Sequence, residues 1–205
     1  MSQLHVQWLG RIDYASALQK QEQLVATHST DTLLLLEHEP VYTIGRTPDQ
    51  SSLRSGVLPH PVLQTNRGGQ ATYHGPGQLV GYPIVDLNPR RRDLHHYLRT
   101  LEELLIEVLV GYDIVAQRRD GLTGVWVDDR KIASIGVGVR KWITMHGFAL
   151  NVSSDLSGFE AITPCGIAGV TMTSLSLELG RPVGVEEFSE ACASHFQKHL
   201  LSRLV

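Results

Sequence analysis

The sequence predicts an α+β fold with a mixed or mostly antiparallel sheet. Helical patterns lie near both ends of long runs of strand-like sequence, and the second half contains hairpin signals. The 205 residues are 42% hydrophobic and 19% charged, so a sizeable core can form and disorder is not expected. This length suits a single domain over residues 1–205, with two small domains as the alternative.

Short strands surround one helix in the first part of the chain. Asp13 can cap a helix over residues 14–27, because its carboxylate can accept hydrogen bonds from the first turn. Residues 46–60, which contain Pro48 and Pro59, are typical of a loop. Alternating or continuous apolar residues predict strands over residues 4–9, 32–36, 41–44 and 61–65.

Residues 67–87 form a glycine-rich stretch that also carries Arg, Gln, Thr, Tyr and His side chains. Core strands rarely hold so much glycine, and plain linkers lack aromatic residues. The combination suggests backbone that a ligand approaches closely, although a glycine-rich loop before a hairpin would have the same sequence pattern. A strand over residues 78–87 leaves this stretch, and Pro83 argues against a central position for it in the sheet.

The second half begins with a helix and continues as a meander. Asp93 caps a helix over residues 94–109, and Gly111 ends it. A second amphipathic helix is expected at the end of the chain, over residues 185–204. Between the helices, strands are predicted over residues 123–127, 131–140 and 143–152, followed by a loop over 153–169.

Charge and cysteine content restrict the possible function. The net charge of -3 implies no general affinity for nucleic acid, and the basic residues at 90–92 and 118–119 are interpreted as solvated loop charge. We find no signal-peptide pattern, and the longest apolar run near the front, residues 33–36, is too short to span a membrane. Only two cysteines are present, which favours free thiols in a reducing cytoplasm.

The two cysteines have different surroundings. Cys192 lies in the apolar stripe of the last helix with Phe188 and Phe196, where a thiol behaves as a small hydrophobic group. Cys165 follows a proline and precedes a glycine, in a segment without helical or strand periodicity. Such a turn can present an accessible nucleophile, although an inert loop cysteine fits the pattern equally well.

A nucleophilic thiol needs a base, and the candidates are histidines such as His74 and His146, or Lys131. Alternation would direct Lys131 to the same face as residues 133, 135, 137 and 139, where burial would favour the neutral amine. By pattern alone, a lysine at a hairpin end that reaches water is the better interpretation. His195 and His199 share a helix face but lack further ligands, so we expect no metal site. No dinucleotide or phosphate-loop motif occurs.

Three blocks of sequence together resemble octanoyl-[acyl-carrier-protein]:protein N-octanoyltransferases, also called lipoyl(octanoyl) transferases or lipoate–protein ligase B. The first block is residues 67–87. The second is residues 130–136 with 144–152, and the third is residues 162–167 with 173–175. Three blocks in the right order and at the right separations are far more specific than any one of them.

The resemblance implies the fold of biotin and lipoate protein ligases, with a larger mixed sheet, a smaller sheet and flanking helices. It implies that Cys165 is the acyl-thioester nucleophile and Lys131 its general acid/base. No cofactor and no ATP would be needed, because one thioester is exchanged for another. The implied substrate contacts are Arg67, Gly68, Gly69, Gln70, Ala71, Thr72, Tyr73, His74, Ser134, Ile135, Gly136, Gly147, Phe148 and Ala149.

The resemblance also implies the partners. The donor is octanoyl-acyl carrier protein, and the acceptors are apo lipoyl domains of 2-oxoacid dehydrogenase complexes and the glycine cleavage H protein. Backbone N–H groups beside Cys165, or others near the second block, are expected to hold the oxyanion. Gly68, Gly69, Gly136 and Gly138 would leave room for the octanoyl chain.

Three rival functions remain open at this stage. An ATP-dependent lipoate or biotin ligase would share the fold. A thiol hydrolase would pair Cys165 with His74 or His146, and a non-catalytic module that binds carrier domains would need neither cysteine nor lysine.

Overall fold

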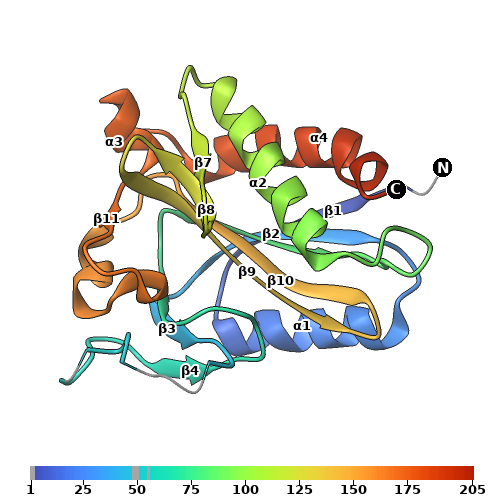
Figure 1. The fold of residues 1–205 in the computed structure, drawn as a ribbon, viewed down its shortest axis with the longest axis horizontal. Coiled ribbons are helices and arrows are strands. Elements are labelled where there is room, and N and C mark those ends of the chain that lie inside the picture. Colours follow the sequence, from blue (N-terminus) through green and yellow to red (C-terminus); the bar gives the residue numbers. More distant parts are fainter. Residues whose placement is uncertain (1–2, 48–50, 55) are drawn as a thin grey trace.

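The computed structural model describes residues 3–47, 51–54 and 56–205, so part of the loop predicted over residues 46–60 lies outside the described residues. Two sheets form the framework (Figure 1). The larger sheet has the order β1-β2-β6-β10-β9-β8-β7, with β11 also paired to β9, and the smaller has the order β4-β3-β5. The β1–β2, β9–β11 and β3–β4 pairs are parallel and the others antiparallel, which confirms the predicted mixed α+β architecture.

Every predicted strand is present, but β1 extends to Ile12, beyond the predicted residues 4–9, and β6 ends at Ile84, before the end of the predicted residues 78–87. The shorter strands β5, β7 and β11 were not predicted, because two or three residues carry no readable periodicity. The strands are β1 (His5–Ile12), β2 (Thr32–His38), β3 (Val41–Ile44), β4 (Val62–Gln64), β5 (Thr72–His74), β6 (Gln78–Ile84), β7 (Gln117–Arg119), β8 (Leu122–Val127), β9 (Arg130–Arg140), β10 (Ile143–Asn151) and β11 (Thr171–Met172).

Helices cover both faces of the larger sheet (Figure 1). On one face, α2 (Leu94–Val110) and α4 (Val185–Arg203) lie side by side, and α1 (Tyr14–Thr27) covers the other. The predicted caps are confirmed, since Asp13 and Asp93 each accept a hydrogen bond from the backbone N–H three residues later. A short helix α3 (Leu175–Leu179) and two 3-10 turns, η1 (Leu156–Ala161) and η2 (Pro164–Gly166), complete the fold.

The main core lies between the larger sheet and the α2–α4 layer. Phe188, Cys192 and Phe196 are fully buried there, as the stripe on the last helix predicts. Burial raises the pKa of Cys192, so this thiol is inert. Within the described residues, no helix is both long and apolar enough to cross a membrane.

Pro83 does not keep β6 at an edge, and the doubt it raised about a central position was wrong. β6 lies between β2 and β10. Its regular pairing with β10 ends at Gly81, and beyond that point the Thr144 hydroxyl donates to the Pro83 carbonyl at 2.7 Å. The missing N–H of Pro83 therefore falls where regular pairing with β10 has already ended.

A β-bulge in β9 contradicts the expected alternation of its side chains. The pairing with β8 slips by one residue between Ala133 and Lys131. Ile132 and Ala133 consequently both belong to the main core. Lys131 projects from the opposite face together with Ser134, so the predicted shared face with residues 133, 135, 137 and 139 is wrong.

Candidate active site

Cys165 is held in a strained turn next to the glycine-rich stretch. Its φ of 55° is in the left-handed region, which costs a non-glycine residue roughly 1–2 kcal/mol. The Cys165 N–H donates to the Ala71 carbonyl at 2.8 Å, and the Gly166 N–H donates to Thr163 at 2.9 Å. These bonds hold the half-buried thiol in one orientation, as expected of a site rather than of a passive loop.

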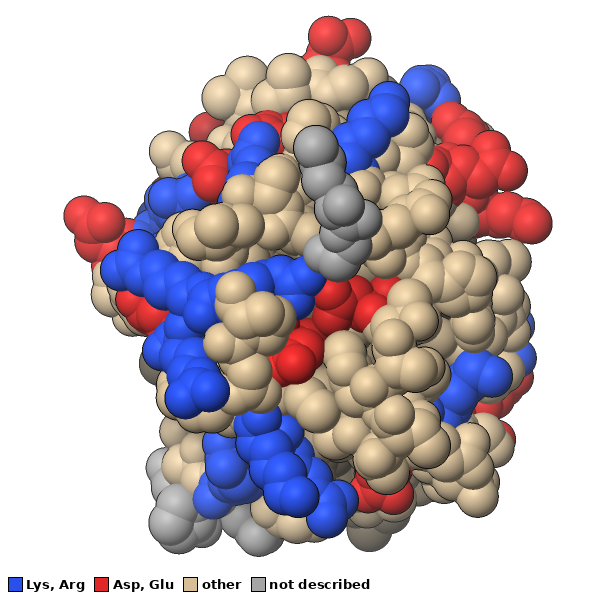
Figure 2. All heavy atoms as spheres, turned by 90° about the vertical axis from the view of Figure 1, so that its right-hand side faces the viewer, with Lys and Arg blue, Asp and Glu red and all other residues tan. Residues whose placement is uncertain are grey.

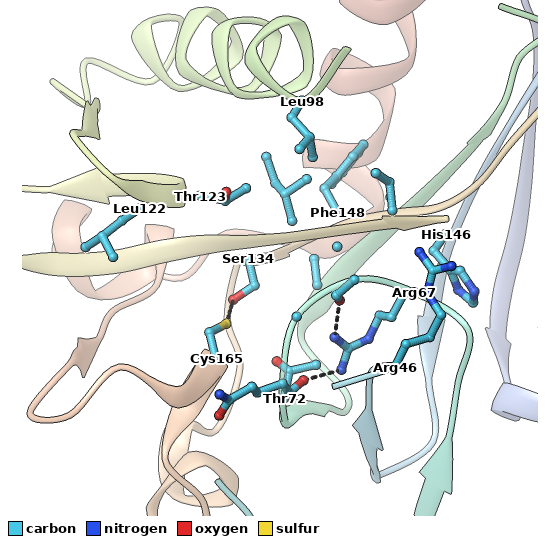
Figure 3. Close-up of a pocket in the computed structure, with 18 of the residues that line it drawn as sticks. Arg46, Arg67, Thr72, Leu98, Leu122, Thr123, Ser134, His146, Phe148 and Cys165 are labelled. Carbon is cyan, nitrogen blue, oxygen red and sulfur yellow. Dashed lines mark hydrogen bonds between the residues drawn. The ribbon is translucent and has the colours of Figure 1, made fainter. Parts of the chain in front are cut away.

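The amine of Lys131 lies 3.4 Å from the Cys165 sulfur. Its side chain is 1% exposed, so the lysine does not reach water, contrary to the interpretation that the pattern alone favoured. The ammonium also lies 5.4 Å from the centre of the Trp126 ring, within cation–π range. The Ser134 hydroxyl lies 3.7 Å from the same sulfur (Figure 3).

These neighbours change the acidity of the thiol. Burial alone would raise the pKa of Cys165, but the charge of Lys131, the Ser134 hydroxyl and the Arg67 guanidinium outweigh it, and the pKa is lowered. A lowered pKa increases the thiolate fraction at neutral pH, and the thiolate is the nucleophilic form. Of the two cysteines, Cys165 is thus the one whose surroundings favour the thiolate.

A cavity of about 460 Å³ adjoins the thiol, a size typical of small-ligand sites. Its residues form two groups (Figure 3). Leu98, Leu122 and Phe148 line an apolar part next to α2, on the opposite side of the strand from Cys165 and Arg67. The sequence-predicted residues in the lining are Arg67, Gly68, Gly69, Gln70, Thr72, His74, Ser134, Ile135, Gly136, Gly147, Phe148, Ala149 and Cys165.

Ala71 and Tyr73 do not line the cavity, because side chains of a strand alternate. Ala71 contributes its carbonyl to the Cys165 turn instead. Tyr73 packs in a small separate core with Tyr42 and Phe159, at ring distances of 5.4 and 5.5 Å. Gly138 also lies outside the lining, against Asn66 and His146.

Arg67 is a buried guanidinium that backbone oxygens hold in place. It is 8% exposed and donates to the carbonyls of Thr43, Gly68 and Gln70 at 2.8–2.9 Å. Its Nε has no partner within the described part of the chain. The guanidinium thus supplies positive charge to the polar part of the cavity and shapes the loop over residues 68–70.

The two histidines that could have served a hydrolase have other partners. His74 Nδ1 lies 2.8 Å from Gln78 Oε1, and His146 Nε2 is hydrogen-bonded to Asn66. Burial lowers the pKa of His74 to about 3 and that of His146 to about 4, so both are neutral at pH 7. Among the described residues, neither forms a hydrogen bond with Cys165.

Sequence reasoning missed several lining residues, because each lies in an element with no visible link to the site. Tyr14 begins α1, and Arg46 follows β3. Leu94 and Leu98 belong to the apolar stripe of α2 and look like ordinary core positions. Only the exposed charge of Arg46, two residues after the end of a buried strand, was a usable signal.

Comparison with known proteins agrees with this geometry. The model of the lipoyl protein ligase A/B catalytic domain matches residues 13–197. An octanoyltransferase from Geobacter metallireducens is 53% identical over 202 residues, 96% of this chain and 93% of that protein. One from Citrifermentans bemidjiense is 54% identical over 192 residues, 92% of this chain and 93% of that protein.

Solved structures share the fold at low identity. A lipoate-protein ligase A bound with ATP superposes with a TM-score of 0.75 at 17% identity, over 98% of this chain and 85% of that one. The biotin protein ligase of Aquifex aeolicus superposes with a TM-score of 0.59 at 15% identity, over 98% and 70% of the two chains.

The fold is therefore that of the lipoate and biotin protein ligases, as predicted. Within it, the chain belongs to the lipoyl protein ligase A/B catalytic domain family and to its octanoyltransferases, which are acyltransferases.

Proposed function

We propose that the protein transfers octanoyl from octanoyl-acyl carrier protein to the acceptor lysine of apo lipoyl domains, through a thioester on Cys165. The contact of 3.4 Å between Lys131 Nζ and the Cys165 sulfur, beside a partly apolar cavity, is the observation that carries this proposal. The acceptors would include lipoyl domains of 2-oxoacid dehydrogenase complexes and the glycine cleavage H protein. A free-thiol nucleophile also favours a reducing, cytoplasmic location.

In the first half-reaction, the neutral amine of Lys131 takes the proton of the Cys165 thiol, which forms an ammonium–thiolate pair. The thiolate attacks the carbonyl carbon of the donor thioester, a new C–S bond forms, and the bond to the carrier sulfur breaks. The departing thiolate receives the proton from Lys131. One thioester replaces another, so the step needs no ATP.

In the second half-reaction, the acceptor lysine attacks the octanoyl-Cys165 carbonyl. Its amine has a reference pKa near 10.4 and must lose protons to become an amide. Lys131, left neutral by the first half-reaction, accepts the proton of the attacking amine. The Cys165 thiolate leaves and regains a proton from Lys131, which closes the cycle.

The backbone N–H groups beside Cys165 are already engaged and are poor candidates for oxyanion donors. The N–H groups of Cys165, Gly166 and Ile167 already donate to carbonyls of the chain. The Gln70 amide lies directly against Gly166, where any Cβ would overlap it. The Thr72 hydroxyl is buried without a partner among the described residues. We therefore propose that these two side chains donate hydrogen bonds to the substrate oxygen on which negative charge develops.

We assign the octanoyl chain to the apolar part of the cavity. Leu98, Leu122 and Phe148 can surround it there, and Gly68 leaves space beside it. Transferring about seven methylene-sized groups from water contributes up to ~5 kcal/mol at roughly 0.8 kcal/mol each. This contribution favours medium-chain donors over short ones.

The exposed cations near the cavity suit an acidic partner. Arg90 has a structural role, because it forms an ion pair with Asp31 at 2.6 Å. The basic cluster at residues 90–92 is therefore smaller than the sequence suggests. The cationic cluster consists instead of the exposed residues Arg91, Arg92, Arg140 and Lys141. Asn88 bonds both the Arg92 side chain and the Lys141 carbonyl, which joins the two loops.

Lys and Arg side chains gather on one side of the end of the molecule that carries both termini (Figure 2). The cationic cluster directly precedes the start of α2, where Leu94 lines the cavity. We propose that it binds the acidic carrier protein. Reversing Arg92 and Lys141 to Glu should raise KM for the carrier-bound donor at unchanged kcat, whereas Arg181→Glu, beyond α3, should not. Equal KM values would discard this surface.

Identity above 50% with octanoyltransferases favours this function over an ATP-dependent ligase, because the ligases share only the fold at 15–17% identity. Intact-mass measurement after incubation with octanoyl-carrier protein tests the covalent route. We expect one added octanoyl group in the wild type and in Cys192→Ala, and none in Cys165→Ala. Absence of an adduct in the wild type would refute the covalent mechanism, and transfer by Cys165→Ala would show that transfer does not need this thiol.

A further inference from the structure

A fully buried carboxylate, Glu102, lies in the core between α2 and the larger sheet. It is 0% exposed, and its position on α2 is surrounded by apolar residues such as Leu101 and Leu105. Burying a carboxylate is unfavourable unless its oxygens are satisfied. One oxygen accepts from Arg99 at 2.7 Å, and the other accepts from the backbone N–H of Gly124 at 2.9 Å.

Gly124 is the residue of β8 that lies beneath the side chain of Lys131. A Cβ built on Gly124 would come within 2.6 Å of Lys131 Cε and 3.2 Å of its Nζ. The φ of Gly124 is +130°, which residues with a side chain rarely adopt. Glycine at this position therefore leaves a groove in which the lysine side chain lies.

The unusual backbone of Gly124 coincides with a break in the sheet ladder. Regular pairing of β8 with β9 involves residues 125–127, next to the bulge in β9. The Gly124 N–H, which is not part of that pairing, finds its acceptor in Glu102. Without this acceptor, the buried N–H would be unsatisfied. A return of this part of β8 to ordinary strand dihedral angles would then be favoured.

Few other contacts hold the amine of Lys131. Within the described residues it has no carboxylate partner, and its polar contact is the Cys165 sulfur, with the Trp126 ring at 5.4 Å. Its position therefore depends on the groove more than on a charged partner. A shift of the groove changes the distance to the sulfur directly.

We propose that Glu102 is a positioning residue, which holds Gly124 in the conformation that places Lys131 against Cys165. The inference rests on the proposed function, in which Lys131 handles the protons of Cys165. Glu102 touches neither substrate nor thiol, and acts through the chain of contacts from α2 to β8 to β9. The alternative is a purely structural role, in which Glu102 anchors Arg99 and Arg118 to α2.

The test is the pH dependence of Cys165 alkylation by iodoacetamide, which requires no acyl donor and so stays informative even if the proposed substrates are wrong. Glu102→Met keeps the volume but removes the acceptor, and should slow alkylation at pH 7 about tenfold, the effect of raising a thiol pKa by roughly one unit. Glu102→Gln keeps an acceptor oxygen and should restore the wild-type profile. Glu103→Met, the exposed neighbour on α2, is the matched control.

A double-mutant cycle separates positioning from general destabilisation. In a Lys131→Met background, Glu102→Met should have no further effect on alkylation, because the group that it positions is gone. A Glu102→Met protein with lowered Tm but a wild-type profile, or with an effect that persists in the Lys131→Met background, would overturn the proposal.

Gly124→Ala gives a second route should Glu102→Met fail to fold. The added methyl meets both Lys131 Cε and the Ala133 carbonyl oxygen at 2.6 Å, while Glu102 is unchanged, so the lysine is displaced and the same slowing is expected. A folded Gly124→Ala protein with the wild-type alkylation profile would also overturn the proposal.

Discussion

Replacing Lys131 with Met should raise the pKa of the Cys165 thiol and slow its acylation. Met keeps the volume and the contact with Trp126 but removes the charge that lies 3.4 Å from the sulfur. Two unit charges at that distance interact by ~1 kcal/mol in water and by ~5 kcal/mol at an effective dielectric constant of about 20. The half-buried thiolate lies between these limits, so we expect a rise of about one to three pKa units.

Alkylation by iodoacetamide in a Cys192→Ala background measures this shift, since only one thiol then remains. The midpoint of the rate profile should move to higher pH, and the rate at pH 7 should fall by up to about 1000-fold. Lys141→Met, which removes an exposed lysine, should leave the profile unchanged. An unmoved midpoint in Lys131→Met would refute the assignment and place the base elsewhere.

Three further predictions address chain length, catalysis and stability. Gly68→Val should shorten the accepted acyl chain, because an added Cβ meets only Val137 O at 3.6 Å and occupies cavity space; an unchanged ratio of octanoyl to butanoyl transfer would contradict this. Gln70→Ala should lower kcat about 10²-fold without moving the alkylation profile, and an unaffected kcat would remove it as oxyanion donor. His74 is neutral when folded, with a pKa of about 3, but binds a proton near pH 6.5 when unfolded. Stability should therefore fall as pH drops from 6.5 toward 3, by up to about 2 kcal/mol at pH 5; His74→Gln should flatten the Tm profile there, and an equally steep profile would argue against buried neutral His74.

The helices were predictable because their signals are local. Asp13 and Asp93 cap the helices that follow them, since a cap requires only neighbouring backbone N–H groups. The stripe that contains Cys192 identified the core face of α4, since three- and four-residue spacings align side chains on any helix. The site was predictable only in part, through three blocks that resemble a known family.

The remaining features depend on pairing between distant segments. The interior position of β6 despite Pro83 follows from where its ladder with β10 ends, which no local pattern records. The Cys165 turn is held by a hydrogen bond from its N–H to the carbonyl of Ala71, 94 residues earlier in the chain. Arg46 and Leu98 reach the same cavity from different elements.

Lys131 shows most clearly the difference between what the sequence determined and what only the tertiary structure decided. The sequence alone determined that a lysine begins the strand after a hairpin turn, in a block that resembles octanoyltransferases. Strict alternation then assigned its side chain to the wrong face. Only the tertiary structure decided otherwise, because a bulge opposite β8 inserts one residue and reverses the alternation, so that Lys131 and Ser134 reach the same sulfur.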